Sequence, residues 1–148
     1  MPRSTRSFLF PDINVWVALT YQGHVHHLAA ADWFDSVDPD SRLYFCRLTQ
    51  LGLLRLLTAE AVMTDEVMNQ QQAWDVYDAW LRDGRVEMMA EPPGLEDRLR
   101  GITRSRNAAH KDWGDSYLAA FAASVRLTLV TFDRGFRTRV KPLILLSE

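Results

Sequence analysis

Short apolar runs that alternate with longer amphipathic stretches constrain the fold of this chain more than any other feature. The clearest runs contain no charged residue: SFLF (7–10), LYFC (43–46), LTLVTF (127–132) and PLILL (142–146). Strands of a parallel sheet have this character, because helices bury them on both faces. The pattern predicts an α/β fold in three layers, with a central parallel sheet of four or five strands and helices on both faces.

The stretches between these runs place apolar residues at helical spacing. We expect helices over about 14–19, 27–37, 48–58, 73–81, 95–105 and 113–125. Residues 85–89 are a further candidate strand, and residues 133–136 are expected to form a tight turn. Asp12 or Asn14 is available to cap the first helix.

Length and composition indicate one ordinary folded domain. The 148 residues, 47% of them hydrophobic and 24% charged, predict a single domain over residues 1–148. The one cysteine, Cys46, lies in an apolar run and is expected to be a buried thiol. No apolar run approaches the roughly 20 residues of a membrane span, and Asp12 and Asn14 interrupt the apolar N-terminal stretch. We therefore expect a cytoplasmic protein without membrane contact.

Three aspartates lie where open α/β sheets place their active sites, beyond the carboxyl ends of the strands. Asp12 follows the first strand, Asp133 follows the strand over 127–132, and Asp115 opens the helix that leads into that strand. Each of them can also be read as an ordinary helix cap or turn residue. Their common position favours convergence in one pocket.

Converging carboxylates need a counter-charge. Two like charges about 4 Å apart repel by roughly 4 kcal/mol at an effective dielectric of 20, so such a site binds cations or keeps a proton. Oxygen ligands without His or Cys favour Mg²⁺ or Mn²⁺ over zinc. A divalent ion in an acidic pocket is suited to phosphodiester hydrolysis. The residues themselves thus indicate metal-dependent phosphate chemistry.

Four segments, in this order, resemble the PIN-domain family: PDINVWVAL (11–19), TQLGLLRLLT (49–58), WGDSYLAAFA (113–122) and LVTFDRGF (129–136). The second segment resembles the VapC toxin subgroup. The resemblance implies a PIN-like three-layer fold and a Mg²⁺-dependent endoribonuclease that is the toxin of a type II toxin–antitoxin system. It implies that Asp12, Asp115 and Asp133 are the catalytic, metal-binding acids. It also implies an RNA substrate such as a tRNA or rRNA loop, a VapB-like antitoxin and a homodimer.

The same resemblance assigns supporting roles. Asn14 would orient the Asp12 carboxylate, and Thr131 would place a hydroxyl near the metal or phosphate. Many relatives carry Glu where this chain has Gln50, which brings no charge, so the site would hold one metal rather than two or bind it more weakly. Asp112 is either a reserve acid or the cap of the helix over 113–125.

Several other polar residues have two interpretations each. Lys111, Arg134 and Arg137, together with Arg139, are either phosphate contacts or solvated surface. His24, His26 and His27 are too few for a zinc site and are expected to serve helix entry and packing, although His27 could approach the RNA. Arg55 lies within an apolar stripe and is expected to pair with an acid rather than to extend into solvent.

Two other functions stay open at this point. A haloacid-dehalogenase-like phosphatase would use Asp12 as a nucleophile, but it would need a second Asp where Asn14 stands. A PIN-like module without activity would only bind RNA or protein, and Gln50 is the feature that supports it.

Overall fold

A five-stranded sheet forms the centre of the computed structural model, which describes residues 6–147. Its strands are β1 (Phe8–Pro11), β2 (Arg42–Phe45), β3 (Val86–Met88), β4 (Thr128–Thr131) and β5 (Leu143–Leu145). All four neighbouring pairs are parallel, in the order β3-β2-β1-β4-β5. The chain moves outward from β1 through β2 to β3 and then returns to the other side of β1. The sheet therefore has its switch point between β1 and β4, where ligands bind in folds of this kind.

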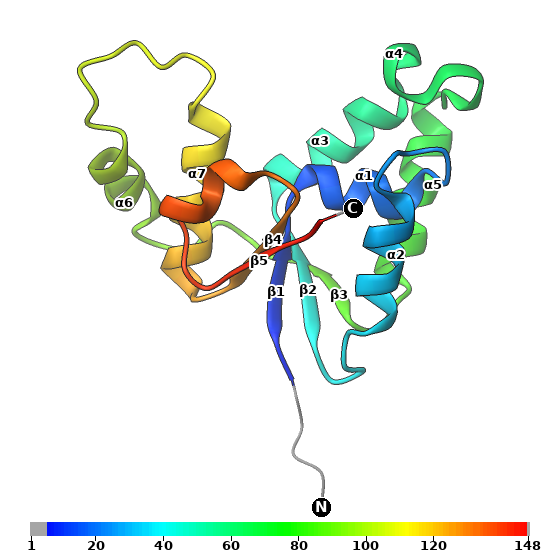
Figure 1. The fold of residues 1–148 in the computed structure, drawn as a ribbon, viewed down its shortest axis with the longest axis horizontal. Helices are drawn as coiled ribbons and strands as arrows, with labels where there is room; N and C mark the ends of the chain where they lie inside the picture. Colours follow the sequence, from blue (N-terminus) through cyan, green and yellow to red (C-terminus); the bar gives the residue numbers. More distant parts are fainter. Residues whose placement is uncertain (1–5, 148) are drawn as a thin grey trace, which may run out of the picture.

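Helices cover both faces of the sheet, as the apolar strands predict (Figure 1). One layer contains α1 (Ile13–Thr20), α2 (His27–Asp35), α3 (Arg47–Leu57), α4 (Glu60–Met63), η1 (Thr64–Glu66) and α5 (Gln70–Leu81). The other contains α6 (Leu95–Ile102), α7 (Trp113–Val125) and η2 (Arg134–Thr138). None of the helices of residues 6–147 is long and apolar enough to cross a membrane.

Each layer has its own apolar core against the sheet. Trp16 of α1 stacks on Phe45 of β2 with ring centroids 4.0 Å apart, on the side of α1 to α5. Phe10 of β1 stacks on Phe121 of α7 at 4.9 Å on the other side. The side chains of successive strand residues point to opposite faces, so Leu9 and Phe10 belong to different cores.

The close approach of α3 to α1 depends on Gly52. A Cβ at this position would overlap the side chain of Ile13, the first residue of α1. Because Ile13 follows Asp12 directly, this packing also fixes the place where the chain leaves β1. The site thus depends on helix packing on the α1 side.

Some local expectations are wrong. Helix α4 and η1 were not anticipated, because segments of four and three residues are too short to show a period. Residues 134–138 form the 3₁₀ helix η2 in place of a tight turn. Helix α6 ends at Ile102, three residues early, and Arg55 is exposed and pairs with no acid among the described residues.

Candidate active site

Asp12 lies at the junction of β1 and α1, and hydrogen bonds hold both oxygens of its carboxylate and its backbone N–H. Its Oδ1 accepts the Ile13 N–H at 2.7 Å, its Oδ2 accepts the Thr131 hydroxyl at 2.8 Å, and its own N–H donates to the Val130 carbonyl at 2.8 Å. The residue is 8% exposed. Burial raises the pKa of the carboxyl, and the charges of Asp115 and Asp133 raise it further against these hydrogen bonds.

Thr131, the last residue of β4, links two of the predicted site acids. Its hydroxyl donates to Asp12 and accepts the N–H of Asp133 at 3.0 Å. Asn14 also donates to this hydroxyl, from Nδ2 at 3.4 Å, and its Oδ1 accepts the Phe132 N–H at 3.4 Å. Asn14 therefore reaches the Asp12 carboxylate through Thr131 and not directly.

Asp115 and Asp133 complete the acidic group. Asp115 lies in the first turn of α7, and burial is the main cause of its raised pKa, followed by the charge of Asp133. Asp133 precedes η2, and its Oδ1 accepts the Gly135 N–H at 2.7 Å. Each raised pKa includes a contribution from another of the three aspartates, so the three carboxylates share one region.

The described residues contain no three His, Cys, Asp or Glu side chains arranged to enclose a metal ion. The donor chemistry still fits a hard cation, since carboxylate oxygens are the ligands that Mg²⁺ prefers. Asp12 also lacks an ion pair with any residue of 6–147, although it is buried. The support for a metal site is therefore the type of donor atom and the electrostatic interaction between the three aspartates. The described side chains do not by themselves form a complete set of ligands around an ion.

Asp112 is part of a separate polar network at the start of α7. Arg139 donates to Asp112 Oδ1 from Nη1 at 2.6 Å and to Oδ2 from Nη2 at 3.3 Å, and Ser116 donates to Oδ2 at 3.0 Å. Arg139 Nη2 also donates to the Ser116 hydroxyl at 2.6 Å. Asp112 has the N-cap position of α7, as the helix-cap interpretation expects, but its side chain makes no capping hydrogen bond. The Arg139 guanidinium lowers the pKa of Asp112.

Comparison with known proteins identifies the fold family. Residues 9–141 match the family model described as PIN domain. The chain belongs to the PIN-domain family. Within it, the chain is 42% identical over 132 residues to Ribonuclease VapC41 of Mycobacterium tuberculosis, across 86% of this chain and 90% of that protein. It is 31% identical over 127 residues to Ribonuclease VapC29 of the same organism, across 84% of each. The chain is therefore also a member of the VapC ribonuclease family.

Solved structures share this fold at low sequence identity. A crystal structure of Mycobacterium tuberculosis VapC20, described as a Sarcin-Ricin loop cleaving toxin, has a TM-score of 0.67 and 17% identity, over 88% of this chain and 93% of that one. VapBC2 from Rickettsia felis bound to a promoter DNA fragment has a TM-score of 0.64 and 14% identity, over 95% and 99%. These likenesses confirm the α/β PIN fold.

Gln50 is engaged by its neighbours in this PIN domain. The residue is buried, and its Oε1 accepts a hydrogen bond from Arg47 Nη1 at 2.5 Å. Arg47 thus places a positive charge beside Gln50, on the helix that packs against α5.

The cations that were predicted to contact RNA lie on the surface. Lys111, Arg134 and Arg137 are exposed, and the two arginines line a hollow together with His26 and Phe132. The His26 ring stacks on Phe132 at 4.4 Å.

The other two histidines make local contacts. His27 Nδ1 lies 2.7 Å from the Ala18 carbonyl oxygen, and His24 Nδ1 accepts the His26 N–H at 3.0 Å. These contacts agree with helix entry and packing. The partnership of Arg139 with Asp112 was missed, because no sequence signal connects positions 27 residues apart.

Proposed function

We propose that this VapC-family ribonuclease is a Mg²⁺-dependent endoribonuclease, and that Asp12, Asp115 and Asp133 are its catalytic, metal-binding residues. The observation that carries the proposal is the buried Asp12 carboxylate, which lacks a cation among residues 6–147 and lies within the electrostatic reach of the other two aspartates. Burial of a charge without a partner is costly, so a site of this kind is suited to a cation.

The carboxylates of the three aspartates would hold Mg²⁺, or Mn²⁺, which has the same preference for oxygen. Bound there, the ion would polarise the scissile phosphate and favour deprotonation of the attacking water. In the hydrolysis the water oxygen bonds to phosphorus, the bond to one ribose oxygen breaks, and that oxygen takes up a proton.

The residues around the aspartates hold the aspartate side chains in place. Thr131 fixes the orientation of Asp12 through its hydroxyl and fixes the backbone of Asp133 through the same atom. Asn14 keeps that hydroxyl in place from the first turn of α1. The pair joins β1 and β4 at the switch point, so the acids on the two strands keep their separation while RNA binds.

The biological setting follows from the relatives. Solved structures with this fold include a toxin–antitoxin complex from Klebsiella pneumoniae. By extension, this chain would be the toxin of a type II pair, silenced by a VapB-like antitoxin. It would form a homodimer and cleave RNA in the cytoplasm, with a tRNA or rRNA loop as the target.

The test is cleavage of total RNA by the purified protein in Mg²⁺, compared with EDTA and with Asp12→Asn. The matched control is Asp32→Asn, which changes an exposed aspartate on α2 that is none of the three proposed metal ligands. Discrete fragments should appear with wild type and with the control and should vanish in EDTA and with Asp12→Asn.

Other outcomes would point elsewhere. Cleavage that persists in EDTA would refute the metal mechanism. RNA binding without cleavage, in Mg²⁺ and in Mn²⁺, would favour the inactive binding module and make Gln50 the first residue to examine. Phosphate attached covalently to Asp12 would favour the phosphatase alternative.

A further inference from the structure

The small net charge of −2 conceals a strong separation of charge along the chain. Residues 98–148 hold ten of the 17 Lys and Arg side chains but only four of the 19 acids. Three of those four acids are Asp112, Asp115 and Asp133. The first 97 residues have the opposite balance, with 15 acids and seven cations. Such asymmetry is typical of a protein that presents one surface to nucleic acid.

Two segments concentrate this difference. The first, named here the basic segment, is residues 98–111, which carry Arg98, Arg100, Arg104, Arg106 and Lys111 and no acid. The second, named the acidic arm, is residues 56–81, which carry Glu60, Asp65, Glu66, Asp75 and Asp78 and no Lys or Arg. The chain of the basic segment between α6 and α7 rises beyond the carboxyl edge of the sheet, and α4 of the acidic arm rises on the opposite side (Figure 1).

The cations of the basic segment are available to a ligand. All five are exposed, and Arg100 is the one that forms an ion pair with a described residue, Glu96, at 3.0 Å. Elsewhere Arg42, Arg85 and Arg139 pair with acids. Five positive charges within 14 residues repel one another, and an external polyanion would remove that repulsion.

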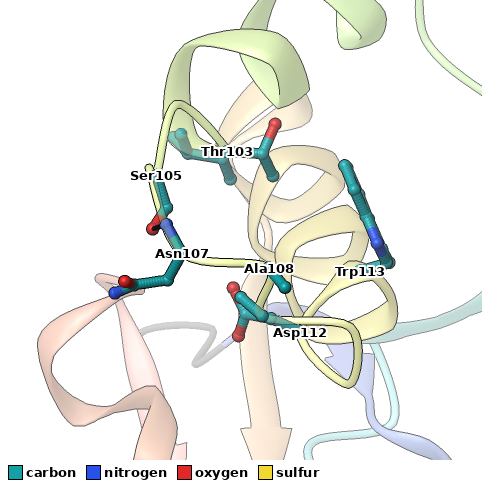
Figure 2. Close-up of a pocket in the computed structure, with 8 residues that line it drawn as sticks. Thr103, Ser105, Asn107, Ala108, Asp112 and Trp113 are labelled. Carbon is teal, nitrogen blue, oxygen red and sulfur yellow. Dashed lines mark hydrogen bonds between the residues drawn. The ribbon is translucent and has the colours of Figure 1, made fainter.

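The basic segment ends directly at the acidic group. Lys111 precedes Asp112, and Asp115 follows within the first turn of α7. Trp113 is 59% exposed at the same place. A cavity lies beside it, lined by Thr103, Ser105, Asn107, Asp112 and Trp113 among others (Figure 2). Hydroxyl and amide groups next to an exposed indole suit an unpaired base, which stacks on aromatic rings.

We propose that single-stranded RNA reaches the acidic group along the basic segment, with its phosphates on Arg98, Arg104, Arg106 and Lys111, and that the acidic arm repels RNA from the other side. The inference rests on the proposed ribonuclease function and adds the direction in which the substrate enters. Arginine suits this role because its guanidinium binds phosphate oxygens through two parallel hydrogen bonds.

The test is the salt dependence of RNA binding in an Asp12→Asn background, where the RNA stays intact. The probe is a fluorescein-labelled oligouridylate of about 20 nucleotides. The segment variant is Arg104→Gln/Arg106→Gln/Lys111→Gln. The control is Arg55→Gln/Arg82→Gln/Arg126→Gln, which removes the same charge from exposed residues outside the basic segment.

The segment variant should bind at least about 10-fold more weakly at low salt. Its slope of log affinity against log salt should be smaller by about 2, because three phosphate contacts contribute about 0.7 each for single strands. The control should keep the wild-type slope. Thermal unfolding of both variants establishes that they are folded.

Failure of this inference is distinguishable from failure of the proposed function, because cleavage is measured on the wild type and binding on the Asp12→Asn proteins. Equal losses in the two triple variants would show that overall charge matters and not the segment, which overturns the inference. Unchanged RNA binding by the segment variant would also overturn the inference. The basic segment would then be expected to bind an acidic protein partner instead of RNA. Absence of cleavage by wild type, with segment-dependent binding, would overturn the proposed function alone.

Discussion

The basic segment (98–111) and the acidic arm (56–81) both expose all of their charged side chains, and these charges are opposite in sign. The acidic arm packs through Met63, Ala73 and Tyr77 into the core on the α1 side, and the basic segment leads from α6 into α7 on the other side. The candidate site combines both parts of the chain, since Asp12 comes from the acidic part and Asp115 and Asp133 come from the basic part. The positions of the charges on a nucleic-acid enzyme therefore indicate its function better than its net charge does.

Two carboxylates show the same difference at the scale of single residues. Asp12 is buried beside other acids, and its pKa is raised. Asp112 lies in the basic part, where Arg139 binds both of its oxygens, and its pKa is lowered. The same carboxylate group therefore has a different role at each of these two positions. Asp12 is suited to a cation that binds from solution, whereas Asp112 already has one from the chain.

The largest expected effect tests whether both parts of the chain supply essential acids. Asp12→Asn and Asp115→Asn should each lower kcat/KM for RNA cleavage by roughly 10³-fold or more, as expected when a residue of a catalytic group is removed. Asp32→Asn should keep wild-type activity. The measurement is the initial rate of cleavage of a defined RNA in Mg²⁺. An Asp115→Asn enzyme with near wild-type activity would exclude that residue from the site.

The next prediction reverses charge on each side separately. Arg104→Glu/Arg106→Glu should lower kcat/KM by about 10- to 100-fold, mainly through a higher KM, because the variant repels the substrate during association. Asp65→Arg/Glu66→Arg on the acidic arm should lower KM by a smaller factor. Both effects should shrink as salt rises, since screening shortens the reach of exposed charges. Equal effects of opposite sign would indicate a response to net charge alone and would remove the distinction between the two sides.

Much of this architecture was available from the sequence, because strong local patterns determine it. The apolar runs predicted the sheet, and the position of Asp12 and Asp133 after buried strands predicted their common edge. The acids were recognisable because each lies directly beside a strand or helix boundary. The charge separation is also present in the sequence, but the net charge of −2 does not reveal it.

The remaining features depend on contacts between distant residues. The bond from Thr131 to Asp12 joins positions 119 apart, and the bond from Arg139 to Asp112 joins positions 27 apart. Helix capping and ion pairing use the same carboxylate of Asp112, and only the packing of η2 against α7 decides between them. Helix α4 is too short for any periodic signal.

A third prediction concerns Arg139 as a positioning residue. Arg139→Gln removes the paired contacts to Asp112 and the bond to Ser116, which flank Asp115 at the start of α7. We expect kcat to fall about 10-fold, the low end of the range for residues that orient metal ligands, with little change in KM.

The comparison variant for this prediction is Arg137→Gln, an exposed residue of η2 that lies two positions before Arg139. It should raise KM and leave kcat unchanged, because it is expected to contact phosphate. Arg139→Lys should recover part of the lost kcat by restoring the charge without the paired geometry. A rise in KM with constant kcat for Arg139→Gln would identify it as an RNA contact instead.

The smallest expected effects compare the two carboxylates by their contribution to stability. The raised pKa of Asp12 means that its charge destabilises the folded state at neutral pH, and this cost disappears as the pH falls through the raised value and the folded form takes up a proton. Asp12→Asn should therefore increase the free energy of unfolding at pH 7, by about 1 kcal/mol if the change has the size typical of single substitutions. The gain should shrink in acid and in Mg²⁺.

Asp112→Asn should have the opposite sign. The lowered pKa of Asp112 means that its charge stabilises the fold above the pKa of the unfolded chain, and that this contribution is lost as the pH falls through the lower folded value. The variant should thus unfold at a lower temperature at pH 7 and approach wild type in acid. The measurement is the midpoint of thermal unfolding of both variants and of Asp32→Asn, between pH 7 and pH 3 without metal. It gives the direction in which each substitution changes stability. If Asp12→Asn and Asp112→Asn shifted the midpoint in the same direction at pH 7, the electrostatic difference between the two parts of the site would not exist, and Asp12 would need no cation from solution.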